Sequence, residues 1–407
     1  MKLSKKIVTV GSAVLAAAIL TACSSTSKDT GESSSSKSTT VSLWVDTANV
    51  DQYKPLVASF EKANPDIKVK MTQSPNGSAN AKTDVAKDPS KAADVFKAPN
   101  DQLGAMAEAG YINPLSPDAT TWVKDNDIEL AATAVSWKGK LYAYPQDEQA
   151  QVLFYNKTKL TADDVKDWAT LTSKGVVGTD FTNAYNWYPA FLSNGTYLFG
   201  KDGETLDGTN ANTPAGVEVM KWFAAQKANP GVKQSGTALL ADFESGKTTA
   251  VIDGPWDAVN IKKFLGDNMG VATYPTVDFG SGSKQLQAFT GVGTLAINSK
   301  AKNQKAATTL AQYLTNEESQ LALFKANGAV PVSKKAQADS TVSADPTTQA
   351  VIKQVTYSTV MPKMPEMANF WTDSAPLIDN AYEGKTAPAD YQSALDKFVT
   401  NISKESK

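Results

Sequence analysis

Apolar positions along the chain alternate between strand-like and helix-like spacing. Short runs rich in Val, Ile, Leu and aromatic residues predict strands at 41–45, 67–71, 94–96, 152–155, 249–252, 271–274 and 292–297. A further segment, 137–144, predicts a hairpin that turns at Lys138-Gly139-Lys140. Between these strands, Tyr53, Leu56, Val57 and Phe60 show the spacing of one buried helix face.

More helices are predicted at 103–109, 302–314 and 317–326, and a last one carries Tyr391, Leu395 and Phe398 on one face. The sequence shows no repeat of fixed period. Strands that alternate with helices are typical of an α/β fold, so we expect layers of helix around largely parallel sheets.

A basic segment, an apolar run and a single cysteine precede this pattern. Lys2, Lys5 and Lys6 stand before the apolar residues 7–20, a run shorter than the roughly 20 residues of a membrane-spanning helix. Cys23, the only cysteine of the chain, ends the motif Leu-Thr-Ala-Cys. The arrangement predicts a lipoprotein signal peptide at 1–22 and lipidation of Cys23; the alternative is an ordinary secretory signal with an incidental cysteine.

Residues 23–40 hold the lipidated cysteine and a stretch rich in Ser and Thr that lacks bulky apolar side chains. Such a stretch cannot bury enough surface to offset its ordering entropy, so we expect a flexible tether. A cysteine with two or more acyl chains anchors a protein firmly. The predicted location is therefore the cell membrane, lipid-anchored on its extracytoplasmic face, with the membrane contacted through the lipid alone.

Composition excludes several kinds of chemistry. The chain of 407 residues has no His, and all of its 40 basic residues are Lys. His-dependent triads, His or Cys metal sites and disulfides are therefore not expected, and neither is a cofactor. The net charge of −2 and the lack of a Lys-dense run disfavour nucleic acid as a partner. Without Arg, bidentate binding of carboxylate or phosphate ligands is also missing.

Acids, amides and aromatic residues stand where predicted strands end, which is where α/β sheets bind ligands. They are Trp44 and Asp46, Asn100 and Asp101, Asp147 with Glu148 and Gln149, the patch Tyr185 to Tyr188, Trp256 with Asp257, and Trp371. A sugar ring offers hydroxyl edges to such acids and amides and an apolar face to an aromatic ring.

Each aromatic residue of this set has core packing as its alternative role, and packing is what we expect for Trp122, Trp137, Trp168 and Trp222. Trp256 and Trp371 are favoured as ligand residues, because each is expected to begin a helix after a breaker or loop. Asp46 and Asp101 have helix N-capping as their alternative role.

At this point the residues resemble a known family, the maltose/maltodextrin-binding proteins that serve ABC sugar importers. The matching motifs are Leu43-Trp44-Val45-Asp46, Ala98-Pro99-Asn100-Asp101, Gly254-Pro255-Trp256, Gly291-Val292-Gly293 and, most specifically, Met361-Pro362-Lys363-Met364-Pro365-Glu366-Met367 leading into Phe370-Trp371. The Gly-Pro-Trp element occurs across many sugar-binding members, whereas the run that begins at Met361 is narrower and points to maltodextrin.

The resemblance implies a monomeric two-lobed fold, each lobe a sheet flanked by helices, with maltose or maltodextrin held in the cleft and passed to importer permease subunits. Lobe one is expected at 41–147 plus 294–337, and lobe two at 148–290 plus 341–407. By position, Asp101 matches an acidic hydroxyl ligand, Tyr185, Trp256 and Trp371 match stacking rings, and Met361 matches an apolar contact. Gln149 stands where the family often has Glu, with Glu148 beside it as a substitute.

The chain departs from the family at four further positions. Lys97 stands where an aromatic residue is common, Ala375 where an Arg can occur, and Ala48 with Asn49 in place of an acidic-basic pair.

Three other functions remain open from the sequence. The protein could bind a different oligosaccharide, or be an adhesin or structural lipoprotein with its aromatic residues in the core. A surface glycosidase would need two carboxyl groups at a defined separation, and Asp46 and Asp101 could meet in space.

Overall fold

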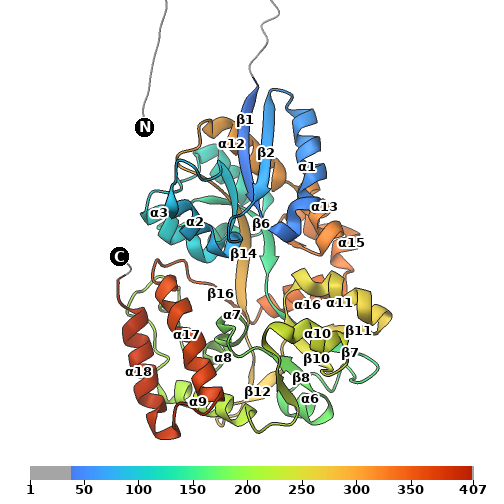
Figure 1. The fold of residues 1–407 in the computed structure, drawn as a ribbon, viewed down its shortest axis with the longest axis vertical. Coiled ribbons are helices and arrows are strands. Elements are labelled where there is room, and N and C mark those ends of the chain that lie inside the picture. The colour runs from blue at the N-terminus through green and yellow to red at the C-terminus, as the bar shows by residue number, and fades with distance from the viewer. Residues whose placement is uncertain (1–37, 406–407) are drawn as a thin grey trace, which may run out of the picture. The chain divides into compact units, whose positions relative to one another are not determined.

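Residues 38–405, which the computed structural model describes, contain a seven-stranded sheet and a five-stranded sheet (Figure 1). The predicted signal peptide, Cys23 and the tether as far as residue 37 lie outside the described residues. The first strand begins at Thr39, so residues 39 and 40 of the predicted tether form part of a strand.

The seven-stranded sheet gathers strands from distant parts of the chain. Its strands are β1 (Thr39–Val45), β2 (Ile67–Gln73), β3 (Val95–Pro99), β6 (Ala143–Gln149), β14 (Phe289–Ile297), β15 (Val330–Pro331) and β16 (Thr359–Val360). The order is β15-β6-β14-β3-β1-β2, and β16 pairs with the start of β14. Val41, Leu43 and Val45 of β1 are buried in alternation with more exposed neighbours, as the two-residue period of a strand requires.

The strands of the five-stranded sheet come, in sequence, between β6 and β14 of the first sheet. Its strands are β7 (Val152–Asn156), β8 (Val177–Thr179), β9 (Val232–Gln234), β10 (Ala250–Asp253) and β11 (Met269–Ala272), in the order β11-β7-β10-β8-β9. Two ribbons complete the strands: β4 (Ser136–Trp137) with β5 (Lys140–Leu141), and β12 (Thr276–Asp278) with β13 (Ser283–Gln285).

Helices separate most of these strands. The longer ones are α1 (Val50–Ala63), α4 (Pro117–Asn126), α9 (Pro214–Gln226), α11 (Ala258–Leu265), α12 (Gln304–Leu314), α13 (Glu317–Asn327), α16 (Pro346–Val355), α17 (Met367–Tyr382) and α18 (Tyr391–Ile402). The shorter ones are α2 (Ala81–Lys87), α3 (Leu103–Glu108), α5 (Glu129–Ala134), α6 (Trp168–Lys174), α7 (Ala184–Trp187), α8 (Pro189–Ser193), α10 (Leu239–Glu244), α14 (Lys334–Ala338) and α15 (Ser340–Ser343). Figure 1 shows α12 and α13, in orange, beside the blue strands and helix of the N-terminal part, so a late segment of the chain packs with an early one.

The expectation of largely parallel sheets is wrong. β1 is parallel to β2 and β3, and β8 is parallel to β9 and β10, but β14 is antiparallel to β3 and β6, and β7 is antiparallel to β10 and β11. A helical crossover returns the chain in the same direction, whereas β7 and β14 arrive from the other sheet. Strand direction therefore follows from these two crossings, which local residue patterns do not reveal.

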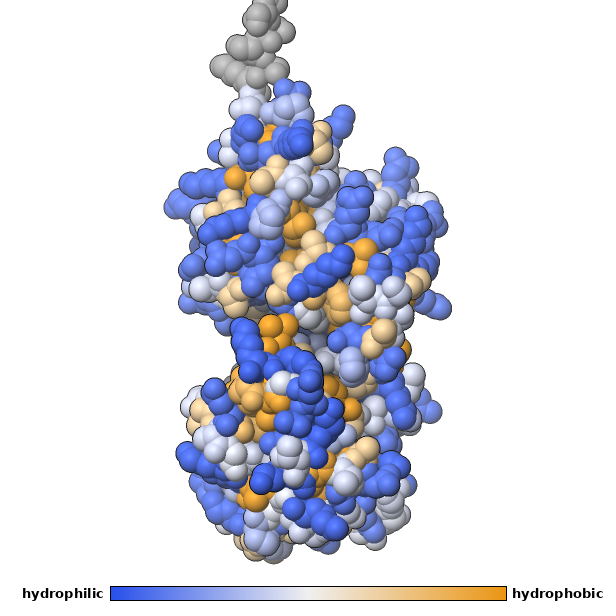
Figure 2. All heavy atoms as spheres, turned by 90° about the vertical axis from the view of Figure 1, so that its right-hand side faces the viewer, coloured by the Kyte–Doolittle hydropathy of each residue, from blue (hydrophilic) through white to orange (hydrophobic). Residues whose placement is uncertain are grey.

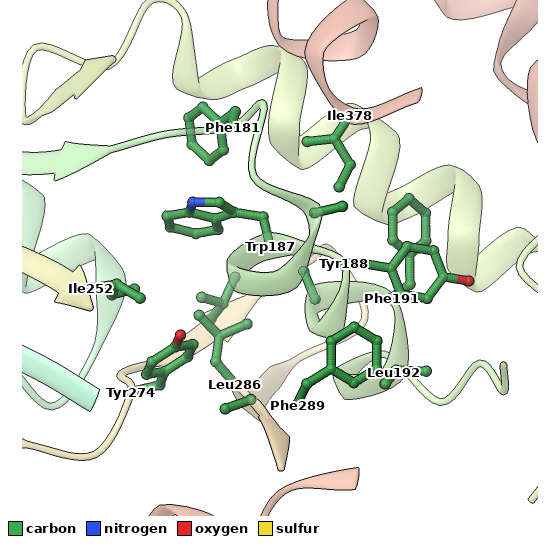
Figure 3. Close-up of a cluster of buried hydrophobic side chains, with 14 of the residues drawn as sticks. Phe181, Trp187, Tyr188, Phe191, Leu192, Ile252, Tyr274, Leu286, Phe289 and Ile378 are labelled. Carbon is green, nitrogen blue, oxygen red and sulfur yellow. The ribbon is translucent and has the colours of Figure 1, made fainter. Parts of the chain in front are cut away.

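Aromatic side chains fill the core beside the five-stranded sheet. Phe181 and Trp187 have ring centroids 4.6 Å apart, and Tyr188 meets Phe370 edge to face at 4.7 Å. Figure 3 shows Trp187, Tyr188 and Phe191 among the buried side chains of this cluster. Trp187 and Tyr188 are thus core residues, and the aromatic patch predicted at 185–188 contributes Tyr185 alone to the site described below.

The four tryptophans assigned to packing behave as expected. Trp137, Trp168 and Trp222 are buried, and Trp122 is half-buried against the core of the first sheet. Across residues 38–405, no helix is both long and apolar enough to cross a bilayer.

Candidate ligand-binding site

A cleft of about 600 Å³ lies between the end of the seven-stranded sheet and the segment that follows β10. Its volume is in the range of small-molecule sites. From the first side it is lined by Asp46, Ala48, Asn49, Gln52, Ser78, Lys97, Asp147, Glu148, Gln149, Ala326, Asn327, Ala329 and Val330, and from the other by Pro255, Trp256, Asp257, Val259, Asn260 and Lys263. Six of the strand-end residues named from the sequence line it, namely Asp46, Asp147, Glu148, Gln149, Trp256 and Asp257.

Trp256 is the most exposed aromatic residue of the cleft, with 43% of its surface accessible. β10 ends at Asp253, and Pro255 begins the short 3-10 helix η5 (Pro255–Asp257) that carries Trp256. A Cβ on Gly254 would lie 2.2 Å from the indole ring. The ring therefore lies directly over the glycine, and the Gly-Pro-Trp motif fixes its position.

Tyr185 stands beside Trp256. Their ring centroids are 6.4 Å apart at an interplanar angle of 29°, and Trp371 lies 6.4 Å from Tyr185 on another side. The Tyr185 hydroxyl donates to the carbonyl oxygen of Gln149 at 3.4 Å. Burial raises the pKa of Tyr185, with the charges of Asp101 and Asp147 adding to the effect. We call Tyr185, Trp256 and Trp371 the aromatic cluster.

Asp101 joins the aromatic cluster to the first sheet. Its Oδ2 accepts a hydrogen bond of 2.9 Å from Trp371 Nε1, while its Oδ1 is buried and has no hydrogen-bond partner within residues 38–405. Burial raises the pKa of Asp101 to about 6, although the bond from Trp371 acts in the opposite direction. An unpaired buried acceptor is costly, so this oxygen is a natural partner for a ligand hydroxyl.

The positions of Asp101 and Trp371 differ from two sequence expectations. Trp371 lies within α17, which begins at Met367, and not at a helix start. Asp101 is the second residue of the 3-10 helix η3 (Asn100–Gln102), whose N-cap is Pro99, so Asp101 is not a helix cap.

The side chain of Asp46 also differs from the expected helix N-cap. It is the N-cap residue of η1 (Thr47–Asn49), yet its side chain makes no capping bond there. Its two oxygens instead accept from the backbone N–H and the hydroxyl of Ser78, at 2.6 and 2.8 Å. The carboxylate thereby holds the start of η2 (Ser78–Asn80) at the rim of the cleft.

Met361 and Asn100 lie at the base of the aromatic cluster. A Cβ on Gly291 would be 2.9 Å from Met361 Cε and 3.4 Å from the Tyr185 hydroxyl, so both side chains pack on the bare backbone of β14. Asn100 is fully buried, donates to Met361 O at 3.3 Å and accepts from Val292 N at 2.9 Å. Asn100 therefore positions Met361, and its predicted ligand contact stays a prediction.

The side chains of Glu148 and Gln149 differ in their surroundings: Gln149 is hydrogen-bonded to Asp147, and Glu148 is buried. The Gln149 amide donates to Asp147 Oδ1 at 2.5 Å. Glu148 is 3% exposed, and burial raises the pKa of its carboxyl group to about 7. The remaining predicted residue, Trp44, is half-buried and packs against the core of the first sheet.

Lys97, which sequence reasoning treated only as a departure from the family, also lines the cleft, beside the strand-end acid Asp147. Lys97 Nζ lies 3.1 Å from Asp147 Oδ2, and both side chains are largely buried. The signal was present in the sequence, because Lys97 interrupts the apolar strand Val95–Pro99. Within the described part of the chain, no group of three or more Cys, Asp or Glu residues is arranged to hold a metal ion.

With this geometry in view, comparison with known proteins defines the class. A family described as bacterial extracellular solute-binding protein matches residues 55–350. The chain belongs to this family, and its two sheets form the two lobes of the family's α/β fold.

Individual relatives have more specific names than the family. A maltooligosaccharide ABC transporter solute-binding lipoprotein of Streptococcus pneumoniae is 28% identical over 424 residues, which cover 98% of this chain and 97% of that protein. The maltodextrin-binding protein MdxE of Bacillus subtilis is 29% identical and covers 92% and 93% of the two chains. The structure of the maltodextrin-binding protein MalE1 from L. casei BL23, without ligand, is 57% identical, with a TM-score of 0.85 over 90% of this chain and 100% of that one.

Proposed function

We propose that the protein captures maltodextrins in the cleft between its lobes and delivers them to the permease subunits of an ABC importer. The observation that supports this most strongly is the aromatic cluster beside a cleft lined by carboxyl and amide groups. The identity of 57% to a maltodextrin-binding protein supports the sugar class.

The arrangement has the two kinds of surface that a glucose chain requires. Trp256 exposes an aromatic face to the apolar side of a pyranose ring, while Asp101, Gln149 and their neighbours hydrogen-bond to hydroxyl groups. One ring stack and several hydrogen bonds are enough for a micromolar Kd, about −8 kcal/mol. The ligand favours the closed form of the cleft only by binding it more tightly than the open form.

We propose further that Cys23 carries lipid and keeps the protein at the extracytoplasmic face of the cell membrane. The motif that ends at Cys23 and the lipoprotein relative support this. We expect Cys23→Ala to leave the membrane fraction, since the variant lacks the residue that would carry the lipid. A variant that still sediments with membranes after a salt wash would exclude this anchor.

Incubation with maltotetraose tests the proposed function against the two other classes. A binder leaves the sugar intact and shows saturable heat in calorimetry and a raised melting temperature. Slow loss of maltotetraose, monitored by chromatography, would instead identify a glycosidase. If the protein neither binds nor degrades maltotetraose, a structural lipoprotein is favoured. Maltose and cellotetraose in the same titration separate maltodextrin binding from binding of another oligosaccharide.

A further inference from the structure

Lys97 and Asp147 form a charged pair in the wall of the cleft that faces Trp256. The distance from Lys97 Nζ to Asp147 Oδ2 is 3.1 Å, and the two side chains are 12% and 6% exposed. Burial alone would lower the pKa of Lys97, but the pKa is raised overall, and at neutral pH the nearby charges that favour the ammonium are those of Asp147 and Asp46. The ammonium group is therefore charged at neutral pH.

The pair exists because one residue of β14 has no side chain. Asp147 on β6 is directly opposite Gly293 on β14, and Lys97 belongs to β3 on the other side of β14. A Cβ on Gly293 would lie 2.6 Å and 2.7 Å from the two oxygens of Asp147. The carboxylate thus crosses over Gly293 to reach a lysine two strands away.

Each member of the pair keeps hydrogen-bonding capacity on the side of the cleft. An ammonium group carries three N–H donors, and within residues 38–405 Asp147 is the one partner of Lys97. Asp147 uses one oxygen for Lys97 and the other for the amide of Gln149, while a carboxylate has about four acceptor positions. Lys97, Asp147 and Gln149 all line the cleft, so a ligand there meets a donor next to an acceptor.

A purely structural ion pair is the simpler role for these two residues. Buried pairs of this kind contribute little net stability, because desolvation of both charges offsets their attraction. The pair also lines the cleft, where a donor and an acceptor side by side complement two adjacent hydroxyl groups.

We propose that Lys97 and Asp147 together determine specificity by binding neighbouring hydroxyl groups of one glucose unit. Lys97 donates to one hydroxyl oxygen, and Asp147 accepts from the adjacent hydroxyl. This inference rests on the proposed function and assigns the second recognition surface of the same cleft. One wall then recognises the apolar face of a sugar through Trp256, and the other recognises a vicinal diol.

The test is calorimetry with maltotetraose and with monodeoxy maltosides that each lack one hydroxyl group. Lys97→Met keeps the length of the side chain and removes the ammonium, and we expect at least a tenfold loss of maltotetraose affinity. Lys385→Met is the matched control, because it removes an exposed lysine paired with Asp379 at 3.0 Å, outside the cleft. Its affinity should equal that of the wild type.

The deoxy series distinguishes recognition from a structural role. At least one monodeoxy maltoside should bind the wild type more weakly than maltose does and lose this disadvantage in Lys97→Met. Unchanged maltotetraose affinity, or a weaker variant that keeps the whole wild-type deoxy profile, would overturn the inference.

A second variant covers the case in which Lys97→Met does not fold. Gly293→Ala displaces Asp147 and leaves Lys97 in place, and the same loss of deoxy discrimination is expected; its absence would overturn the inference. A wild-type protein that binds no maltotetraose would instead contradict the proposed function. Failure of this inference and failure of the proposed function therefore give different results: the first leaves maltotetraose binding by the wild type intact, and the second abolishes it.

Discussion

Trp256 is the residue that the cleft exposes most for contact with a ligand. Its ring lies over Gly254, is held by the turn at Pro255 and stacks loosely with Tyr185. An aromatic face that is fixed before a ligand arrives loses little conformational entropy on binding. Its energetic contribution should therefore be large relative to its area.

We predict that Trp256→Ala weakens maltotetraose binding tenfold or more, about 1.4 kcal/mol or above, while the fold survives. The side chain is 43% exposed, so its removal leaves no large cavity. Tyr357→Ala is the control, since Tyr357 is a similarly exposed aromatic residue that does not line the cleft. Equal Kd values for Trp256→Ala and the wild type would remove the stacking role.

The sequence allowed part of this site to be predicted at the level of single residues. Asp46, Glu148, Gln149 and Trp256 were found because polar and aromatic residues at strand ends are typical of α/β binding sites; the first three belong to the seven-stranded sheet, and Trp256 follows β10 of the five-stranded sheet. Trp187 and Tyr188 looked equivalent to Tyr185 by composition, yet they turn into the core. Which side of a short helix faces the cleft depends on the neighbouring lobe, and a local pattern does not contain that information.

At the level of elements, the strands were easier to predict than their directions. The hairpin turn at Lys138-Gly139 is confirmed, with positive φ at both residues, which is the conformation that tight β-ribbons need. The helix at α1 is confirmed by burial of Tyr53, Leu56 and Phe60. The antiparallel directions of β7 and β14 were missed, because each strand enters its sheet from the other lobe rather than through a helical crossover.

The same crossing strand shapes the site. β14 carries Gly291 under Met361 and Tyr185, and Gly293 under Asp147. At these two glycines, the side chains of three other segments therefore pack directly on the backbone of β14. Gly291-Val292-Gly293 is one of the motifs that carry the family resemblance, but its physical role depends on the strand order β6-β14-β3.

At the scale of the whole molecule, the fold buries several carboxyl groups, and burial raises their pKa values toward neutral pH. Burial raises the pKa of Asp101 to about 6 and the pKa values of Asp127, Glu148 and Asp253 to about 7. Between its unfolded and folded pKa, such a group binds more protons in the folded state than in the unfolded state. The free energy of unfolding that it contributes is therefore complete at low pH and falls as the pH rises through the folded value.

Glu148 gives this effect a direct test, because burial is the cause of its shift from 4.5 to about 7. Such a shift corresponds to at most about 3 kcal/mol of stability, present below pH 4.5 and lost by pH 8. Gln cannot titrate, so we predict that Glu148→Gln reduces the fall in unfolding free energy between pH 5 and pH 8, measured by urea denaturation. Glu244→Gln, which changes an exposed carboxylate at the end of α10, should keep the wild-type difference. An identical pH dependence in Glu148→Gln and the wild type would mean that the cleft admits enough water to ionise Glu148 without cost.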